Sequence, residues 1–168
     1  VKLIHFPVLE RVDANIVLLD KMKEKFVQSV LTADEELVGT TVDVKNKAIR
    51  KFEEIKELHQ PYSKRVDALI KEFNSYYELG YETSILLMGD SENAQLVKSK
   101  TAIMNDKLLK LQKSINNFRE YKIRFIAEIL FKYMDVVFFQ FVINFPFYHC
   151  GKFVVHYFHI VIGEEKLN

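Results

Sequence analysis

The sequence has few of the residues that interrupt helices or build metal sites. Tryptophan is absent, and the 168 residues include only five glycines, three prolines and one cysteine. Scarce glycine and proline favour helix over sheet, because both residues destabilise the interior of a helix. The lone Cys150 excludes an intramolecular disulfide bond and does not identify the cellular compartment.

The sequence also lacks an excess of charge of one sign. Its 24 basic and 23 acidic residues leave a net charge of +1, and they are mixed along the chain. A nucleic-acid-binding protein would carry a basic stripe, so we expect no nucleic-acid partner. The length suits one domain with a continuous core. Because the chain begins at Val1 without a methionine, a signal peptide or an apolar span, we expect it to be part of a longer protein.

Apolar residues recur at spacings of three and four, which is the period of packed helices. They predict helices over residues 7–31, 34–59, 62–88 and 91–124 or beyond. Helices of about 25 residues, each roughly 38 Å long and joined by short turns, pair as antiparallel neighbours. We therefore expect an all-α fold, in which residues 1–124 form an antiparallel up-down-up-down four-helix bundle and residues 125–168 form an apolar C-terminal extension.

Each predicted helix carries an apolar stripe that should face the bundle axis. In the first helix the stripe is Leu9, Val12, Ile16, Leu19, Phe26 and Val30, interrupted by Lys23. In the third it is Val66, Leu69, Phe73, Tyr76, Gly80, Thr83 and Leu87. In the fourth it is Val97, Thr101, Met104, Leu108, Leu111, Ile115 and Phe118, continuing to Phe125 and Ile129. The weaker second stripe is Val44, Ala48, Phe52, Ile55 and Leu58. The predicted core includes Phe26, Phe52, Phe73, Leu108, Leu111 and Ile115.

The breaks between the helices have the residues of helix ends. Pro61 lacks an amide donor and disfavours helix at Gln60, so the second helix should end there. Gly89 can take the left-handed conformation after the third helix. The expected N-caps are Thr32 or Asp34 for the second helix, and Asp90 or Ser91 for the fourth.

The composition changes after Arg124. Of the 22 aromatic residues, 12 lie between Phe125 and Phe158, and residues 136–151 carry no charged side chain. That run is shorter than the roughly 20 residues that a membrane helix needs. Three interpretations remain open: a truncated membrane span with a helix over residues 136–143 that breaks near Pro146, an apolar hairpin or helix packed on the bundle, or a non-native end. A native tail should bury this surface in lipid or against another chain.

Residues capable of chemistry do not form a recognisable site. His149, Cys150, His156 and His159 lack the paired spacing of a zinc site. The di-metal bundles need Glu-x-x-His motifs, which do not accompany the acidic residues Glu35, Glu36, Glu53, Glu54 and Glu57. We therefore expect no catalytic residue, no metal and no cofactor, and a protein that is not an enzyme.

Some side chains are weak candidates for binding a ligand. Tyr76 and Tyr77 lie near the middle of the third helix, close to Tyr81. There they either fill the core or a dimer seam, or line a cleft between helices that holds a small ligand. An arginine can bind a carboxylate ligand through two parallel hydrogen bonds, or simply carry surface charge. The arginines in question are Arg11, Arg50 and Arg65. The ligand-binding candidates are Tyr76, Tyr77 and Arg65.

Several stretches resemble a known family. They are residues 6–11 (FPVLER), 29–37 (SVLTADEEL), 73–80 (FNSYYELG) and 87–90 (LMGD). Their order over residues 1–121 resembles the extracytoplasmic four-helix sensor domains of bacterial transmembrane signalling proteins. These are chiefly methyl-accepting chemotaxis receptors, with related domains on sensor histidine kinases and diguanylate cyclases. The tail after Arg124 departs from the family pattern.

The resemblance implies the ligand-sensing periplasmic domain of a chemoreceptor-like signal transducer in the inner membrane. It implies a homodimer that binds a small molecule, directly or through a periplasmic binding protein, and that reaches the membrane through flanking segments. No ligand-binding motif of the family maps onto positions of this chain. The alternative is a non-catalytic helical scaffold or protein-interaction bundle.

Overall fold

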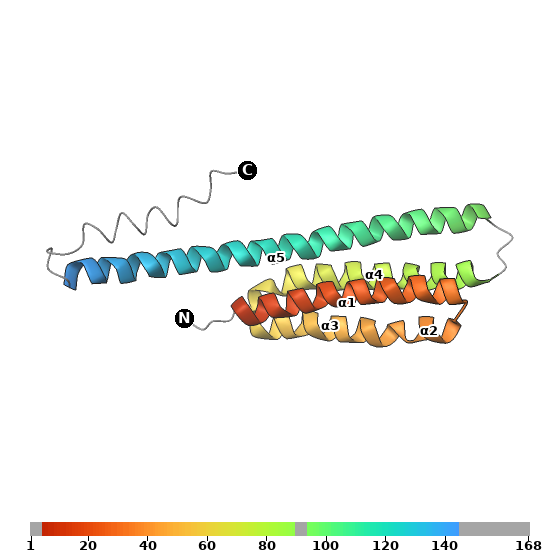
Figure 1. Ribbon diagram of the computed structural model, residues 1–168, viewed down its shortest axis with the longest axis horizontal. Coiled ribbons are helices and arrows are strands. Elements are labelled where there is room, and N and C mark those ends of the chain that lie inside the picture. The colour runs from red at the N-terminus through yellow and green to blue at the C-terminus, as the bar shows by residue number, and fades with distance from the viewer. Residues whose placement is uncertain (1–4, 90–93, 145–168) are drawn as a thin grey trace. The chain divides into compact units, whose positions relative to one another are not determined.

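The computed structural model describes residues 5–89 and 94–144, with the side chains of the last helix described as far as Phe138. Within these ranges the chain is helical and contains no strand, which confirms the expected all-α class. The elements are α1 (His5–Thr32), α2 (Glu35–Gly39), α3 (Thr41–Leu58), the short 3-10 helix η1 (Gln60–Tyr62), α4 (Ser63–Met88) and α5 (Ala94–Asn144) (Figure 1). The chain divides into two compact units, Val1–Ile126 and Ala127–Asn168, and α5 contributes residues to both.

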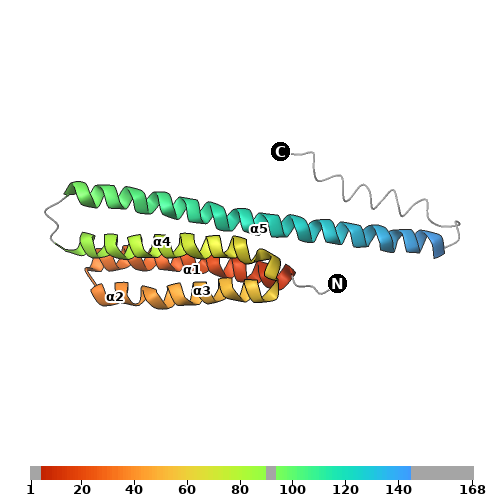
Figure 2. The same ribbon diagram turned by 180° about the vertical axis from the view of Figure 1, so that it is seen from behind.

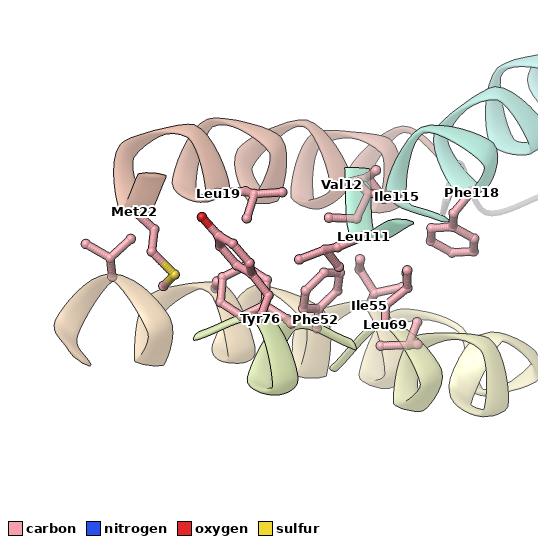
Figure 3. Close-up of a cluster of buried hydrophobic side chains, with 14 of the residues drawn as sticks. Val12, Leu19, Met22, Phe52, Ile55, Leu69, Tyr76, Leu111, Ile115 and Phe118 are labelled. Carbon is pink, nitrogen blue, oxygen red and sulfur yellow. The ribbon is translucent and has the colours of Figure 1, made fainter. Parts of the chain in front are cut away.

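The core of the first unit lies where α1, α3, α4 and the first part of α5 meet. Helices α1, α3 and α4 pack side by side, as both views show (Figures 1 and 2). Side chains from all four helices converge on one apolar cluster (Figure 3). The cluster members labelled there are Val12, Leu19 and Met22 of α1, Phe52 and Ile55 of α3, Leu69 and Tyr76 of α4, and Leu111, Ile115 and Phe118 of α5.

The buried stripe of α1 differs from the predicted one at every second position. The buried residues are Val8, Val12, Asn15, Leu19, Met22, Phe26 and Ser29. The prediction had Leu9, Ile16, Lys23 and Val30 in place of Val8, Asn15, Met22 and Ser29. The prediction was wrong there because Asn15 and Ser29 are polar. The apolar neighbours Ile16 and Val30 were therefore assigned to the buried stripe in their place. Lys23 does not interrupt the buried stripe, because Met22 occupies that position.

The stripe of α4 confirms the prediction almost completely. Val66, Leu69, Phe73, Tyr76, Gly80 and Thr83 are buried, and the exception is Leu87, which is 41% exposed. Gly80 is needed for close packing, because a Cβ atom there would lie 2.6 Å from Cε2 of Phe26. The absence of a side chain at Gly80 therefore makes room for the ring of Phe26.

The core residues predicted in α5 need one correction and one addition. Leu111, Ile115 and Phe118 are buried, whereas Leu108 is partly buried at the edge of the cluster. Lys122 is completely buried one turn beyond Phe118, where the prediction passed over it. The remaining core residues that were predicted, Phe26, Phe52 and Phe73, are all buried.

The predicted second helix is divided at Thr40 into α2 and α3. The predicted cap at Asp34 is confirmed, since its side chain accepts a 2.9 Å hydrogen bond from the amide of Leu37. Thr32 instead donates its hydroxyl to the carbonyl of Gln28 within α1. The Thr40 hydroxyl donates to the carbonyl of Leu37 and accepts from Nζ of Lys25, each at 2.7 Å. These bonds hold the α2–α3 junction against the end of α1.

The left-handed residue lies at a different turn from the one predicted. Gly89 has φ −78° and ψ 154°, so it is extended and the prediction was wrong. Ala33 has φ 51° instead, directly after α1. Its amide donates to the carbonyl of Val30 at 3.4 Å, and the amide of Asp34 donates to the carbonyl of Ser29 at 2.9 Å. This pair of bonds is the Schellman motif, which stabilises the strained alanine. The predicted caps Asp90 and Ser91 lie outside the described residues.

In the described part of the second unit, α5 is apolar over most of its circumference. Its charged residues Glu128, Lys132 and Asp135 are spaced four and three apart, which places them on one narrow stripe. The exposed apolar side chains are Leu130, Phe131, Tyr133, Met134, Val136, Val137 and Phe138. In the ranges 5–89 and 94–144, we find no helix with both the length and the apolar character that crossing a membrane requires. Residues 136–143 are helical, and Pro146 lies outside the described residues.

Candidate functional site

A buried lysine enclosed by aromatic rings is the most unusual chemical feature of the first unit. Lys122 of α5 is 0% exposed, and its Nζ lies 3.0 Å from the centroid of the Tyr62 ring. Three rings of α5 itself surround the same nitrogen, at 4.7 Å for Tyr121, 5.4 Å for Phe118 and 5.8 Å for Phe125. Phe118 and Phe125 lie four and three residues from Lys122 and so share its face of α5, while Tyr121 is its neighbour in the sequence. Within the described ranges, Nζ of Lys122 has no hydrogen-bond partner.

Other helices add basic groups around this lysine. The ring of His5, at the start of α1, lies 4.6 Å from Phe125 and 5.9 Å from His59. The His59 ring, after α3, lies 4.3 Å from Tyr62. The guanidinium of Arg65 in α4 lies over the rings of Tyr121 and Phe118, at 5.0 and 5.8 Å. We call the whole group the lysine–aromatic cluster: His5, His59, Tyr62, Arg65, Phe118, Tyr121, Lys122 and Phe125.

Burial and like charges shift the proton equilibria of this cluster. Burial, with a further contribution from Arg65, lowers the pKa of Lys122 to about 8. Burial also lowers the pKa of His5, and the charges of Lys122 and His59 lower it further. The pKa of Tyr62 is raised, first by burial and then by Tyr121. The ring faces attract an ammonium group and so oppose the lowering at Lys122.

A groove between α1 and α5 is the best candidate for a ligand site. It has a volume of about 330 Å³, which lies within the range of small-molecule pockets. Ile16, Leu19 and Asp20 line it from α1, and Gln112, Ile115 and Asn116 line it from α5. A carboxylate and two amides thus face a partly apolar surface. We call this feature the α1–α5 groove.

A second, smaller groove of about 220 Å³ lies between α4 and α5. Its lining residues are Arg65, Ala68, Leu69, Glu72, Ser114, Asn117 and Phe118. Oε1 of Glu72 lies 3.8 Å from Nζ of Lys110, whose side chain is 70% exposed. The volume is below the range of small-molecule pockets. We therefore interpret this groove as an ordinary depression of the surface beside the lysine–aromatic cluster.

The structure places Arg65 in a different part of α4 from Tyr76 and Tyr77, the other two ligand-binding candidates that the sequence suggested. Tyr76 is buried in the core with its ring 6.3 Å from Phe26, and burial raises its pKa to about 12. Tyr77 is half-buried, and Nζ of Lys45 lies 4.5 Å from its ring. Neither tyrosine lines either groove described above. Arg65 belongs instead to the lysine–aromatic cluster, so the three residues do not form one site.

Sequence reasoning missed Lys122 of the cluster and the three polar residues of the groove. Lys122 falls on the same three-and-four spacing that joins Phe118 to Phe125, and this periodicity could have found it. The groove residues Asp20, Gln112 and Asn116 border the stripes and have no pattern of their own. Arg11, another predicted candidate, pairs with Glu10 at 2.7 Å and with Glu54 at 3.1 Å.

Four residues of the tail are of types that can bind a metal ion. His149, Cys150, His156 and His159 lie outside the described residues. Among the residues that are described, no three His, Cys, Asp or Glu side chains group together in a way that could hold a metal ion. Comparison with protein families, with curated proteins and with solved structures finds no match to this chain.

Proposed function

We propose that this chain is the ligand-sensing periplasmic domain of a chemoreceptor-like transmembrane signal transducer. The observation that carries the proposal is the α1–α5 groove, because both helices contribute lining residues to it. A ligand held there contacts α1 and α5 together and so favours one arrangement of the two helices. A displacement of α5 is then the output, with no catalytic residue, metal or cofactor involved.

The proposed architecture is an antiparallel up-down-up-down four-helix bundle with an apolar extension. The start of α1 contacts the end of α3 through Arg11 and Glu54, and the later part of α1 contacts the residue before α3 through Lys25 and Thr40. The ion pairs Lys56–Asp67, Lys100–Glu82 and Lys110–Glu72 support the same order for α3 with α4 and for α4 with α5. Asp13 with Arg119, at 2.6 Å, supports it for α1 with α5.

The lining of the groove favours a small molecule that carries an amino group. Asp20 supplies a carboxylate to pair with an ammonium, and Gln112 and Asn116 supply amides that both donate and accept hydrogen bonds. The apolar residues Ile16, Leu19 and Ile115 suit a short aliphatic portion. Amino acids and small amines therefore fit this site, either free or delivered by a periplasmic binding protein.

Signal transfer in this proposal uses the continuity of α5. The helix runs unbroken from Ala94 to Asn144, so a shift near residues 112–116 is passed along its backbone. A coupling free energy of about 1–3 kcal/mol is typical of allosteric proteins.

Flanking segments would attach the domain to the inner membrane, and the apolar side chains of residues 130–138 suit contact with lipid. Exposed Val17, Val27 and Leu31 on α1 suit a homodimer contact.

The alternative is a non-catalytic helical scaffold or protein-interaction bundle. One observation favours it: the exposed apolar side chains between Leu130 and Phe138 would also suit a partner helix. A scaffold needs no ligand in the α1–α5 groove. Substitutions of the residues that line this groove should therefore impair a sensor and leave the function of a scaffold unchanged.

Ligand-dependent stabilisation of the full chain tests the sensory function. We expect a member of a panel of amino acids and small amines to raise the melting temperature, since a ligand at 100 times its Kd stabilises by about 2.7 kcal/mol. Asp20→Asn should abolish the shift. The matched control is Glu78→Gln, which changes an exposed carboxylate on α4 and should leave the shift intact. Equal responses of the two variants would contradict a site at Asp20.

A further inference from the structure

The lysine–aromatic cluster joins α1, α4 and α5 to the connection between α3 and α4. His5 comes from α1, His59 follows α3, and Tyr62 belongs to η1. Arg65 comes from α4, and Lys122 and three rings come from α5. The contact of Lys122 with Tyr62 links α5 to the α3–α4 connection. Any change in this contact therefore changes how α5 is held in the bundle.

The charge of Lys122 is poorly compensated where it lies. Its Nζ is out of water and, in the part of the chain that is described, has neither a hydrogen bond nor an ion pair. The attraction of the ring faces compensates for part of the hydration free energy that the ammonium loses on burial. An unpaired ammonium nevertheless loses more on burial than such contacts return, so burial favours the neutral amine.

The neighbouring groups reinforce this preference. The titratable or charged side chains of the cluster are His5 from α1, His59 after α3, Tyr62 from η1, Arg65 from α4 and Tyr121 from α5 itself. All of them are basic groups or phenols, and none is a carboxylate. The positive charge of Arg65 repels the ammonium and does not neutralise it. His5, whose pKa is lowered, is neutral in the range where Lys122 titrates and offers no compensating negative charge. A proton on Lys122 thus acts against the packing of α5.

We propose that the lysine–aromatic cluster is a proton-responsive contact. Neutral Lys122 packs α5 against Tyr62, and protonation of Lys122 weakens this packing. The domain would then report pH in addition to any ligand in the α1–α5 groove. This property rests on the cluster alone and does not depend on the sensory function proposed above.

Titration of the full chain by NMR tests the proposal directly. Lysine labelled with carbon-13 at Cε reports the protonation of each side chain, and tyrosine labelled on the ring reports the position of Tyr62. Lys122→Met assigns the lysine signal, with Lys122→Gln as a second variant if the first does not fold. Lys110→Met assigns a control lysine, whose side chain is 70% exposed.

We expect Lys122 to titrate at least one pH unit below Lys110, which is a tenfold weaker proton affinity. The ring signal of Tyr62 should move with the same midpoint, and that movement should disappear in Lys122→Met. Titration of Lys122 together with Lys110 would overturn the proposal. A lowered pKa with no movement of Tyr62 would overturn it equally, because the charge would then not control the contact.

Discussion

Replacing Lys122 by methionine should make the first unit more stable near neutral pH and remove part of its pH dependence. Burial lowers the pKa of Lys122 from 10.5 to about 8 in the folded protein. Each pKa unit corresponds to about 1.36 kcal/mol, so the buried charge costs at most about 3 kcal/mol below pH 8. Methionine keeps the length of the side chain without the charge. It forfeits a cation–π attraction of about 0.5–2 kcal/mol, which leaves a net gain of about 1–3 kcal/mol near pH 7.

The sign of the pH dependence follows from the lowered pKa. Between about pH 8 and pH 10.5, the unfolded chain binds more protons at Lys122 than the folded chain does. The free energy of unfolding of the wild-type chain therefore rises with pH in this window, and the penalty is fully present below it. The advantage of Lys122→Met should accordingly shrink as the pH increases from about 7 to about 10.

Urea denaturation followed by circular dichroism measures this difference. The full wild-type chain, Lys122→Met and the control Lys110→Met are compared at about pH 7 and at about pH 9.5. We expect the first variant to lose most of its advantage at the higher pH, while the control tracks the wild type. An advantage that does not change with pH, or a Lys122→Met variant that is less stable at pH 7, would refute the reasoning.

Four further substitutions test the packing by the same denaturation assay. Phe73→Ala, at a fully buried ring 6.1 Å from Phe52, should cost about 3–5 kcal/mol, and a loss below about 1 kcal/mol would contradict its central position. Gly80→Ala should cost about 1–2 kcal/mol, because overpacking against Phe26 exceeds the gain in helix propensity of about 1 kcal/mol, and a gain in stability would show that Phe26 moves freely. Asn15→Leu should stabilise by about 1–3 kcal/mol, because the buried amide has no hydrogen-bond partner among the described residues, and a loss would reveal a partner for it. Asp34→Ala should cost about 1 kcal/mol by removing the cap at Leu37, whereas an unchanged stability would mean that solvent replaces the cap.

The helices were predictable wherever the buried stripe is made of apolar residues. In α4 the sequence shows the stripe directly, and five of its positions carry Val66, Leu69, Phe73, Tyr76 and Gly80 as predicted. In α1 the packing buries Asn15 and Ser29 while leaving Val17 66% exposed. A prediction from residue polarity alone therefore places the stripe one position away from the residues that are buried. Tertiary packing decided the register there, and no local signal in the sequence contains that information.

The turns divide in the same way between local and tertiary causes. The cap at Asp34 depends on residues three apart, so the sequence was sufficient to predict it. The left-handed turn at Ala33 is stabilised by backbone bonds to Val30 and Ser29, which any residue can make, and alanine gives no warning of it. The break at Thr40 coincides with a hydrogen bond from Lys25, a contact between helices that only the fold creates.

The functional features were the least predictable part. Tyr76 and Arg65 drew attention as residue types that suit a ligand, yet one fills the core and the other lies over aromatic rings. The α1–α5 groove depends on which residues of two helices distant in sequence face each other. Lys122 was within reach of the periodicity of α5, but a lysine on a seam is normally assigned to the surface.

Hydrogen exchange of the full chain, with and without an amine ligand, tests the central claim most directly. The ligand is the member of the amino-acid and amine panel that most raises the melting temperature of the wild-type chain. The account predicts slower exchange of amides around residues 16–20 of α1 and residues 112–116 of α5, and the same response in Glu78→Gln. Protection confined to other helices, or protection that persists in Asp20→Asn, would contradict a sensory groove between α1 and α5.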